Sequence, residues 1–427
     1  MLNIILGYFK CFMKWIFWKM VQIQSYSLWI FKKKHPDSIT HSELLKGHEC
    51  TDPIYPIVFI HGLLMFGEES PLIYGHTDFY ADYLRKLNPK IDIYCPTIGP
   101  VHGWKYRSLE AIIKTKLKYP QWSVHNPVHL IGHSLGGLTV VCIGGILQNP
   151  AKHVVNTAIV RDIIDKYRMG LGSKYAGISG RLTTEKINFK QILDVLFVDQ
   201  SYGDKMIISI TTLCGALNNC HFVEDKITID ITRRRAIPDR DSIFYLFSVG
   251  IRLYAYYAPS LLKNILNFDY GLDIYRLGIR SFWDCFTNVG ELTGEDYVMW
   301  DLYNPGNAEI WRDISFSKNI SYLFIAFQHQ NALWLFNHMS SILNLIYLIN
   351  HPKFTEENDG LISVSTQLKK GQLLNRQSYF YGRSIYYAIE YGDHMDALVP
   401  KVLDNHEDIC RNLLKYLNIM AKHREKK

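Results

Sequence analysis

The feature that most constrains this chain is the run Val-His-Leu-Ile-Gly-His-Ser-Leu-Gly-Gly at residues 128–137. Its first half is a short apolar run with β-branched residues, which predicts a buried strand, and residues 138–147 are apolar and small, as in a buried helix. Gly-x-Ser-x-Gly between a strand and a helix predicts a sharp turn that lifts the Ser134 hydroxyl above a sheet. Gly132 and Gly136 are then required, because a Cβ at either position would collide with the neighbouring strand and helix.

The composition indicates a large globular chain of ordinary charge. With 427 residues it can form one large α/β domain with insertions or more than one domain, and a hydrophobic share of 48% allows a large core. The net charge of +7 is spread out, and basic and aromatic residues are not interleaved as in a nucleic-acid-binding surface, so we expect no nucleic-acid partner. The 8 cysteines include no Cys-x-x-Cys pair, which argues against a thiolate zinc site, and a local Cys214–Cys220 disulfide stays open.

Residues 1–50 differ from the rest of the chain. Residues 2–18 are rich in Leu, Ile, Phe and Trp but contain two lysines, and a run of three lysines ends at residue 34. This segment is too interrupted for a clean membrane span, and it lacks the basic start and small-residue cleavage site of an ordinary signal peptide. An uncleaved anchor or interfacial segment, an atypical signal peptide and an apolar helix packed on the domain all stay open. We expect a membrane-associated protein or one secreted through the secretory pathway.

The remaining apolar runs predict a single domain of alternating strands and helices at 51–427. Two insertions interrupt it: one at about 149–205, where Gly170, Gly172, Gly177 and Gly180 indicate loops, and one at about 218–319, whose apolar stretch 243–262 suits a helical lid over a cleft. Besides the strand before Ser134, the sequence predicts strands at 57–60, 91–95, 206–212, 322–327 and 384–390, and a short extended piece at 361–365. It predicts helices at 78–87, at 331–349 and at 403–427, and one more that opens within 98–107 and runs to about 119.

A second group of candidate site residues lies upstream of Ser134. The predicted strand Ile57–Ile60 is followed by His61, Gly62 and Leu63. A His-Gly after such a strand resembles the place where α/β-hydrolases donate a backbone N–H to the oxyanion, which implies that the amides of Leu63 and Leu135 form an oxyanion hole. We expect His61 itself to hold the turn rather than to take part in chemistry.

Ser134 needs a histidine base held by a carboxylate, because a serine hydroxyl is a poor nucleophile at neutral pH. The chain order expected for this arrangement is Ser, then Asp or Glu, then His. Among 17 histidines, His394 follows a late strand in a polar, Gly-bounded turn, and Asp359 lies in a tight turn. Asp393 competes for the acid role, but a residue next to His394 in sequence points away from its ring. We therefore predict a triad of Ser134, Asp359 and His394.

Several motifs together resemble a known family, the large lipases that include the thermoalkalophilic bacillus lipases and the staphylococcal lipases. The resemblance covers most of residues 55–400. It implies an α/β-hydrolase fold, in which helices flank a mostly parallel central sheet and helical lid insertions cover the acyl cleft, and a triacylglycerol lipase-like activity. The motifs that carry it are Pro56 to Gly62, Gly99-Pro100 with Trp104, Arg107, Glu110 and Ala111, Gly132 to Gly137, Glu357-Asn358-Asp359-Gly360 and Asp393-His394.

The chain departs from this family at its metal sites. The two zinc-binding histidines that the family carries before the nucleophile turn are missing, although Asp269 to Asp273 resembles the loop that holds another zinc-site aspartate. Asp396 could match one calcium ligand of the family, but no second carboxylate follows in register. We therefore expect that the chemistry requires no cofactor, leave a structural calcium open and predict that zinc is absent.

The sequence thus predicts a serine carboxylic ester hydrolase that cleaves acyl lipid esters through an acyl-enzyme on Ser134. Its expected partners are a lipid ester substrate and a membrane or lipid-droplet interface. An acyltransferase or a thioesterase uses the same machinery and stays open. A catalytically dead lipid-binding fold is the alternative from another class, and its signature would be the loss of a triad residue, which the sequence does not show.

Overall fold

The computed structural model of the chain describes the central sheet and many of the helices around it. The predicted N-terminal segment 1–50, the apolar stretch 243–262, the predicted helix 331–349 and the loop Asp269–Asp273 lie outside the described residues. The described backbone comprises residues 55–63, 67, 76–99, 102–198, 201–218, 220, 227–230, 235–238, 298–328, 359, 362–368, 385–391, 394 and 406–425.

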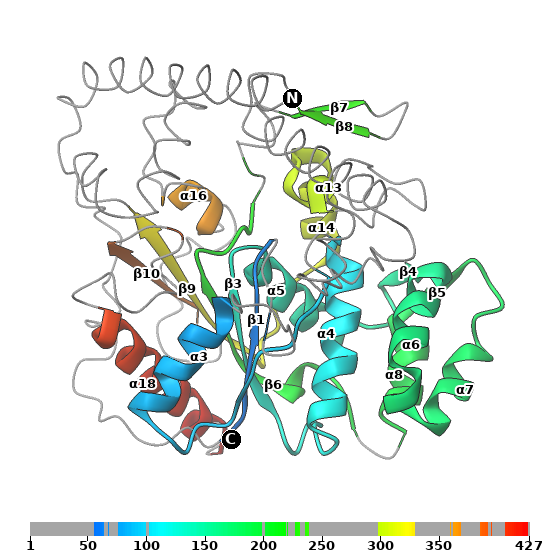
Figure 1. The fold of residues 1–427 in the computed structure, drawn as a ribbon, viewed down its shortest axis with the longest axis horizontal. Helices are drawn as coiled ribbons and strands as arrows, with labels where there is room; N and C mark the ends of the chain where they lie inside the picture. The colour runs from blue at the N-terminus through cyan, green and yellow to red at the C-terminus, as the bar shows by residue number, and fades with distance from the viewer. Residues whose placement is uncertain are drawn as a thin grey trace, which may run out of the picture.

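Six parallel strands form the main sheet of the described part, in the order β10-β9-β6-β3-β1-β2 (Figure 1). Their short apolar sequences, rich in β-branched and aromatic residues, suit strands that are buried on both faces. Because β3 lies between β1 and β6, the turn that follows β3 is near the middle of the sheet. The strands are β1 (Ile57–Ile60), β2 (Ile93–Tyr94), β3 (Val128–His133), β6 (Ile207–Leu213), β9 (Ser321–Gln328) and β10 (Ile385–Tyr391).

Helices cover both faces of this sheet. Successive strand residues point to opposite faces: Val58 and Ile60 belong to the core beneath α4 (Trp104–Lys118) and α5 (Leu135–Gln148). Ile57 and Phe59 belong to the other core, beneath α3 (His76–Leu87) and α18 (His406–Glu425). Figure 1 shows these two pairs of helices on either side of the strands. The predicted α/β class, with a mostly parallel sheet flanked by helices, is confirmed.

The insertion between α5 and β6 is more regular than its glycines suggest. It contains a two-stranded antiparallel sheet and three helices, which lie beside α4 in Figure 1. The expectation that Gly170 and Gly177 mark loops is wrong, because both lie inside helices. A Cβ on Gly170 would come within 3.3 Å of Leu117, and one on Gly177 within 3.1 Å of Val195, so these glycines allow close packing. The elements are β4 (Val154–Asn156), α6 (Thr157–Leu171), α7 (Ser173–Ser179), β5 (Lys186–Asn188) and α8 (Phe189–Leu196).

The remaining described elements are η2 (Asp204–Met206), which directly precedes β6, and several elements between β6 and β10. The extended piece expected at 361–365 is partly wrong, because a short helix, α16 (Val364–Gln367), begins there. Its start is stabilised by the Ser363 side chain, which accepts a hydrogen bond from the Thr366 amide. The others are β7 (Ile227–Asp230), β8 (Arg235–Pro238), α13 (Val298–Leu302) and α14 (Asn304–Asp313).

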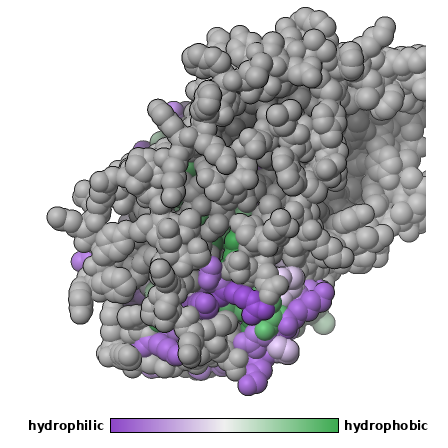
Figure 2. All heavy atoms as spheres, turned by 90° about the vertical axis from the view of Figure 1, so that its left-hand side faces the viewer, coloured by the Kyte–Doolittle hydropathy of each residue, from purple (hydrophilic) through white to green (hydrophobic). Residues whose placement is uncertain are grey.

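One face of the described part can be followed in a space-filling view. Figure 2 shows one side of the molecule, where hydrophilic side chains predominate among the residues that are coloured. Within the described ranges, no helix combines the length and the hydropathy that crossing a membrane requires.

Candidate active site

Ser134 occupies a strained turn between β3 and α5. Its φ of 54° and ψ of −123° lie in a region that non-glycine residues rarely adopt. Neighbouring backbone holds the turn in place: the Ser134 amide donates to the Leu213 carbonyl (3.0 Å), and the Ser134 carbonyl accepts from the amides of Gly137 and Ala216 (2.9 Å each). The end of β6 thus fixes the conformation that raises the Ser134 side chain at the carboxyl edge of the sheet.

Two glycines make this turn sterically possible. A Cβ on Gly132 would lie 2.2 Å from the Gly136 carbonyl oxygen, and a Cβ on Gly136 would lie 2.2 Å from the Ile60 carbonyl oxygen. Both contacts are with backbone, which cannot move aside. The prediction that side chains here would collide with the neighbouring strand and helix is confirmed. The second contact also places the first turn of α5 against the end of β1.

Asp359 and His394 form a buried pair. His394 Nδ1 lies 2.6 Å from Asp359 Oδ2, and both side chains are at most 1% exposed. The backbone supports the same pairing, because the His394 amide donates to the Asp359 carbonyl (2.8 Å). The other carboxylate oxygen, Oδ1, accepts a hydrogen bond from the Ile362 amide (2.8 Å). A carboxylate held in this way fixes the orientation of the imidazole and leaves Nε2 as its reactive nitrogen.

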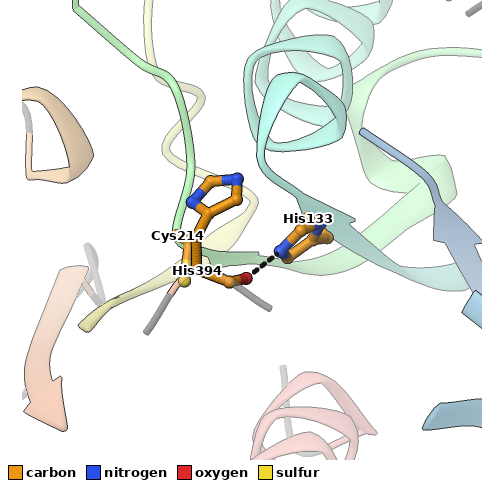
Figure 3. Close-up of side chains that lie close together, drawn as sticks. All are labelled: His133, Cys214 and His394. Carbon is orange, nitrogen blue, oxygen red and sulfur yellow. Dashed lines mark hydrogen bonds between the residues drawn. The ribbon is translucent and has the colours of Figure 1, made fainter. Parts of the chain in front are cut away.

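His133 connects this pair to the serine turn. Its Nε2–H donates to the His394 carbonyl (2.8 Å), and the two rings are 4.9 Å apart (Figure 3). His394 therefore lies beside the residue that precedes Ser134. Among the described residues, His394 Nε2 has no hydrogen-bond partner, so no Ser134–His394 bond is formed in this structure. Such bonds are often long in a ligand-free site and tighten when substrate binds. The competing residue Asp393 lies outside the described part.

The predicted oxyanion donors are at two neighbouring chain segments. Leu135 is the first residue of α5, where a backbone N–H is not used within the helix and the helix dipole favours negative charge. Leu63 follows β1 and is half-buried. Because Gly136 packs against the carbonyls of Ile60 and His61, the two segments approach each other closely. This arrangement suits a pair of amides that converge on one oxygen.

His61 has a structural role, as expected. Its Nδ1–H donates to the Gly62 carbonyl (2.9 Å), and its Nε2 accepts from the Ile98 amide (2.9 Å), so both nitrogens are used in holding the turn. Burial, and secondarily the nearby Arg107 charge, lower its pKa to about 3. His61 is therefore neutral at physiological pH.

Arg107 is a buried residue of the site region whose role the sequence did not reveal. It donates to three different segments: to the His61 carbonyl (2.6 Å), the Gly99 carbonyl (2.6 Å) and the Thr139 hydroxyl of α5 (3.0 Å). It thereby ties the turn after β1 to the helix that starts with Leu135. Its place between Trp104 and Glu110 in the resembling motif was the available signal, but a motif does not indicate which atoms a side chain contacts.

Glu110, one helical turn from Arg107, completes this buried network. Its carboxylate accepts hydrogen bonds from the Gly99 amide (2.6 Å), the Tyr167 hydroxyl (2.6 Å) and the Lys166 ammonium (3.2 Å). Burial raises the pKa of Glu110, but the lysine charges and the hydrogen bonds outweigh it, and the pKa falls to about 2. Burial also lowers the pKa of Arg107 to about 9. Both groups are therefore charged at pH 7.

The residues present do not fit the zinc site of the lipase family that the sequence resembles. The short connection between α4 and β3 contains a single histidine, His125, which is exposed. The family's calcium region, with Asp396, lies outside the described residues. Cys214 and Cys220 are not bonded to each other, so the local disulfide is not formed.

Sheet order, covering helices and the turn at Ser134 define an α/β-hydrolase fold, and solved structures agree. Three similar structures are EstA from Clostridium botulinum (17% identity, 92% of this chain and 93% of that one, TM-score 0.56), the Staphylococcus hyicus lipase (16%, 92% and 100%, 0.54) and lipase 1 from Pelosinus fermentans (15%, 86% and 99%, 0.52). No protein-family model matches the sequence, and no curated protein does. At these identities the likeness establishes the fold.

Proposed function

We propose that this protein is a serine carboxylic ester hydrolase. The observation that carries the proposal is the buried Asp359–His394 pair, which His133 holds beside the strained turn at Ser134. A hydroxyl raised at the edge of the sheet, a histidine of fixed tautomer with a free Nε2, and amides at a helix N-terminus are the parts that acyl transfer to serine requires.

In the proposed mechanism His394 Nε2 removes the Ser134 proton while Oγ attacks the ester carbonyl. The carbonyl π electrons move to the oxygen, and the amides of Leu63 and Leu135 donate to the resulting oxyanion. Collapse of the tetrahedral intermediate breaks the bond to the alcohol, which takes the proton from His394 and leaves. Water then attacks the acyl-serine with the same base and releases the acid. Asp359 keeps Nδ1–H oriented and stabilises the positive imidazolium.

Lipid esters are the proposed substrates, with a triacylglycerol-like ester as the first candidate. Two of the similar structures are named lipases and the third is named EstA, which supports an acyl-ester substrate in general. The apolar sequence of residues 1–18 and 243–262 supports activity at a membrane or lipid-droplet interface, and a membrane-associated or secreted location.

A substrate series tests this proposal. Purified protein is assayed on p-nitrophenyl esters of graded chain length and on emulsified triacylglycerol, with and without a serine-reactive phosphonate. Release of fatty acid that the phosphonate abolishes, with one phosphonate bound to Ser134, supports the hydrolase. Acyl transfer to an added alcohol in preference to water would point to an acyltransferase instead. No reaction with either acceptor would refute the proposed catalytic activity.

The apolar stretch 243–262 makes interfacial activation testable as well. If this segment covers the site in water and turns toward lipid at an interface, the rate on a short-chain ester rises abruptly where the ester exceeds its solubility. Large apolar side chains gain about 1.5–3 kcal/mol each on burial in lipid, enough to offset lost contacts with the body. A rate that passes smoothly through the solubility limit, unchanged by Phe247→Ser or Tyr254→Ser, contradicts the moving lid.

A further inference from the structure

The turn that holds Asp359 is closed by two hydrogen bonds with Ile362. The Asp359 amide donates to the Ile362 carbonyl (3.1 Å), and the Ile362 amide donates to the carboxylate oxygen Oδ1 (2.8 Å). The other oxygen, Oδ2, lies 2.6 Å from His394 Nδ1. Because one carboxylate oxygen is bound to Ile362 and the other to the imidazole, a displacement of Ile362 would pull the carboxylate out of line with His394.

Gln367 of α16 joins Ile362 to the end of β9, and Figure 1 shows α16 next to this strand. The Gln367 side chain is completely buried. Its Oε1 accepts from the Phe327 amide (2.8 Å), and its Nε2 donates to the carbonyls of Phe327 (3.1 Å) and Ile362 (3.3 Å). A primary amide has one acceptor oxygen and two N–H donors, and here all of them are used on backbone atoms. The side chain thus extends β9 toward the turn at Asp359.

The helix that carries Gln367 is itself fixed by the chain that leaves β6. The amides of Leu217 and Asn218 donate to the Thr366 carbonyl (3.2 Å each), and the Asn218 side chain donates to the Ser365 carbonyl (2.8 Å). These bonds satisfy carbonyls that the last turn of a helix leaves open. The Gln367 amide therefore extends from an anchored helix.

The same end of β9 also sets the position of the base. Phe327 is paired in parallel register with Glu390 of β10, and β10 ends shortly before His394. His394 is thus attached to the Phe327 backbone through β10, and Asp359 is attached to it through Gln367. The distance between carboxylate and imidazole depends on both attachments.

We propose that Gln367 is a positioning residue, whose amide holds the Asp359 carboxylate at hydrogen-bonding distance from His394. Its effect on catalysis rests on the proposed function, whereas its effect on the Asp359–His394 bond does not. Gln367→Met keeps the length of the side chain and removes all three hydrogen bonds. On a soluble ester kcat should fall by about 10- to 100-fold with KM nearly unchanged, because small displacements of a reacting group have effects of this size.

A double-mutant cycle separates positioning from a general structural role. In an Asp359→Ala background no carboxylate remains to be positioned, so the addition of Gln367→Met should change kcat by less than about twofold. An equal loss of kcat in both backgrounds would overturn the proposal, as would full activity of Gln367→Met alone. Gln367→Glu keeps the acceptor and loses at least one N–H donor, so it should show a smaller loss, and it replaces Gln367→Met if that variant does not fold.

Trp122→Phe is the matched control. It removes a different buried bond from a side chain to the backbone, from Trp122 Nε1 to the Met206 carbonyl (3.1 Å). Met206 directly precedes β6, at the edge of the sheet opposite to Ser134. This variant should lower the resistance to urea and leave kcat unchanged. A loss of kcat equal to that of Gln367→Met would show that any buried bond has this effect, against a positioning role.

Proton NMR tests the same positioning without catalysis. The proton of so short a His394–Asp359 bond resonates far downfield. Its signal should be present in wild type and in Trp122→Phe, absent from Asp359→Ala, and shifted or weakened in Gln367→Met. This pattern in a protein that hydrolyses no ester would refute the proposed function and leave the positioning role. Absence of the signal from wild type, or an unchanged signal in Gln367→Met, overturns the positioning role.

Discussion

The triad predicts a ranking of single-residue losses. Ser134→Ala should abolish ester hydrolysis, because no acyl-enzyme can form. Asp359→Asn should lower kcat by about 10⁴-fold, since an amide at this position stabilises the wrong His394 tautomer. Asp393→Asn should have a much smaller effect. Steady-state kinetics on a soluble ester measure all three, and a larger loss for Asp393→Asn than for Asp359→Asn would transfer the acid role to Asp393.

Arg107 should contribute strongly to stability. Arg107→Met leaves the carbonyls of His61 and Gly99 without their donor and the Glu110 charge without its buried neighbour, which should lower the free energy of unfolding by about 3–5 kcal/mol. Thr139→Val removes only one of the three contacts and should cost about 1 kcal/mol. Urea denaturation followed by circular dichroism compares the variants. Equal losses of stability would show that the contacts of Arg107 with His61 and Gly99 add nothing to its contact with Thr139.

The roles of some of these residues could be predicted from the sequence and those of others could not, for a physical reason. Ser134, Gly132 and Gly136 were predictable because local backbone geometry demands them. Asp359 and His394 could be selected by chain order and by their turns. The network of Arg107 depends on where three distant segments meet, and no local pattern encodes that meeting. Gln367 contacts Phe327 and Ile362 only because α16 lies next to β9.

At the scale of elements, the His133 side chain links the turn at Ser134 to His394. His133→Phe keeps a ring in place but removes the donor to the His394 carbonyl. We expect kcat to fall by roughly 10- to 100-fold, because small displacements of a reacting group have effects of this size. His133→Gln should recover much of the loss, since its amide can donate in place of Nε2. If His133→Gln is as slow as His133→Phe, or if both variants keep full activity, the positioning role is contradicted.

Strands were easier to predict than the elements between them. The runs at 57–60, 206–212 and 322–327 correspond closely to β1, β6 and β9, because buried parallel strands are short, continuous apolar segments. The insertion was misjudged at Gly170 and Gly177, since glycine is used there for helix packing rather than for a turn. α16 was missed because a four-residue helix stabilised by Ser363 carries too few residues for a periodic pattern.

For the whole molecule, buried neutral histidines predict acid sensitivity. Burial lowers the pKa values of His61, His102 and His129 to about 3. Between about pH 6.5 and 3 these side chains are protonated in the unfolded chain but neutral in the folded one, so stability falls as the pH falls. Each contributes a slope of up to ~1.4 kcal/mol per pH unit.

Urea denaturation at pH 7, 6 and 5 measures this dependence. His129→Gln should reduce the slope of the unfolding free energy against pH by about the contribution of one proton. A slope that is the same in His129→Gln as in wild type would mean that His129 is not neutral in the folded protein.

The long separation along the chain between the serine turn and its partners has a consequence for synthesis. His133 and His394 are 261 residues apart, and the sheet is completed outward from β3 through β6 and β9 to β10. At 5–20 residues per second, translation needs roughly 10–50 seconds to cover that distance. During this time the proposed nucleophile has no base. On the proposed function, a growing chain therefore cannot hydrolyse an ester until the last strand has joined the sheet.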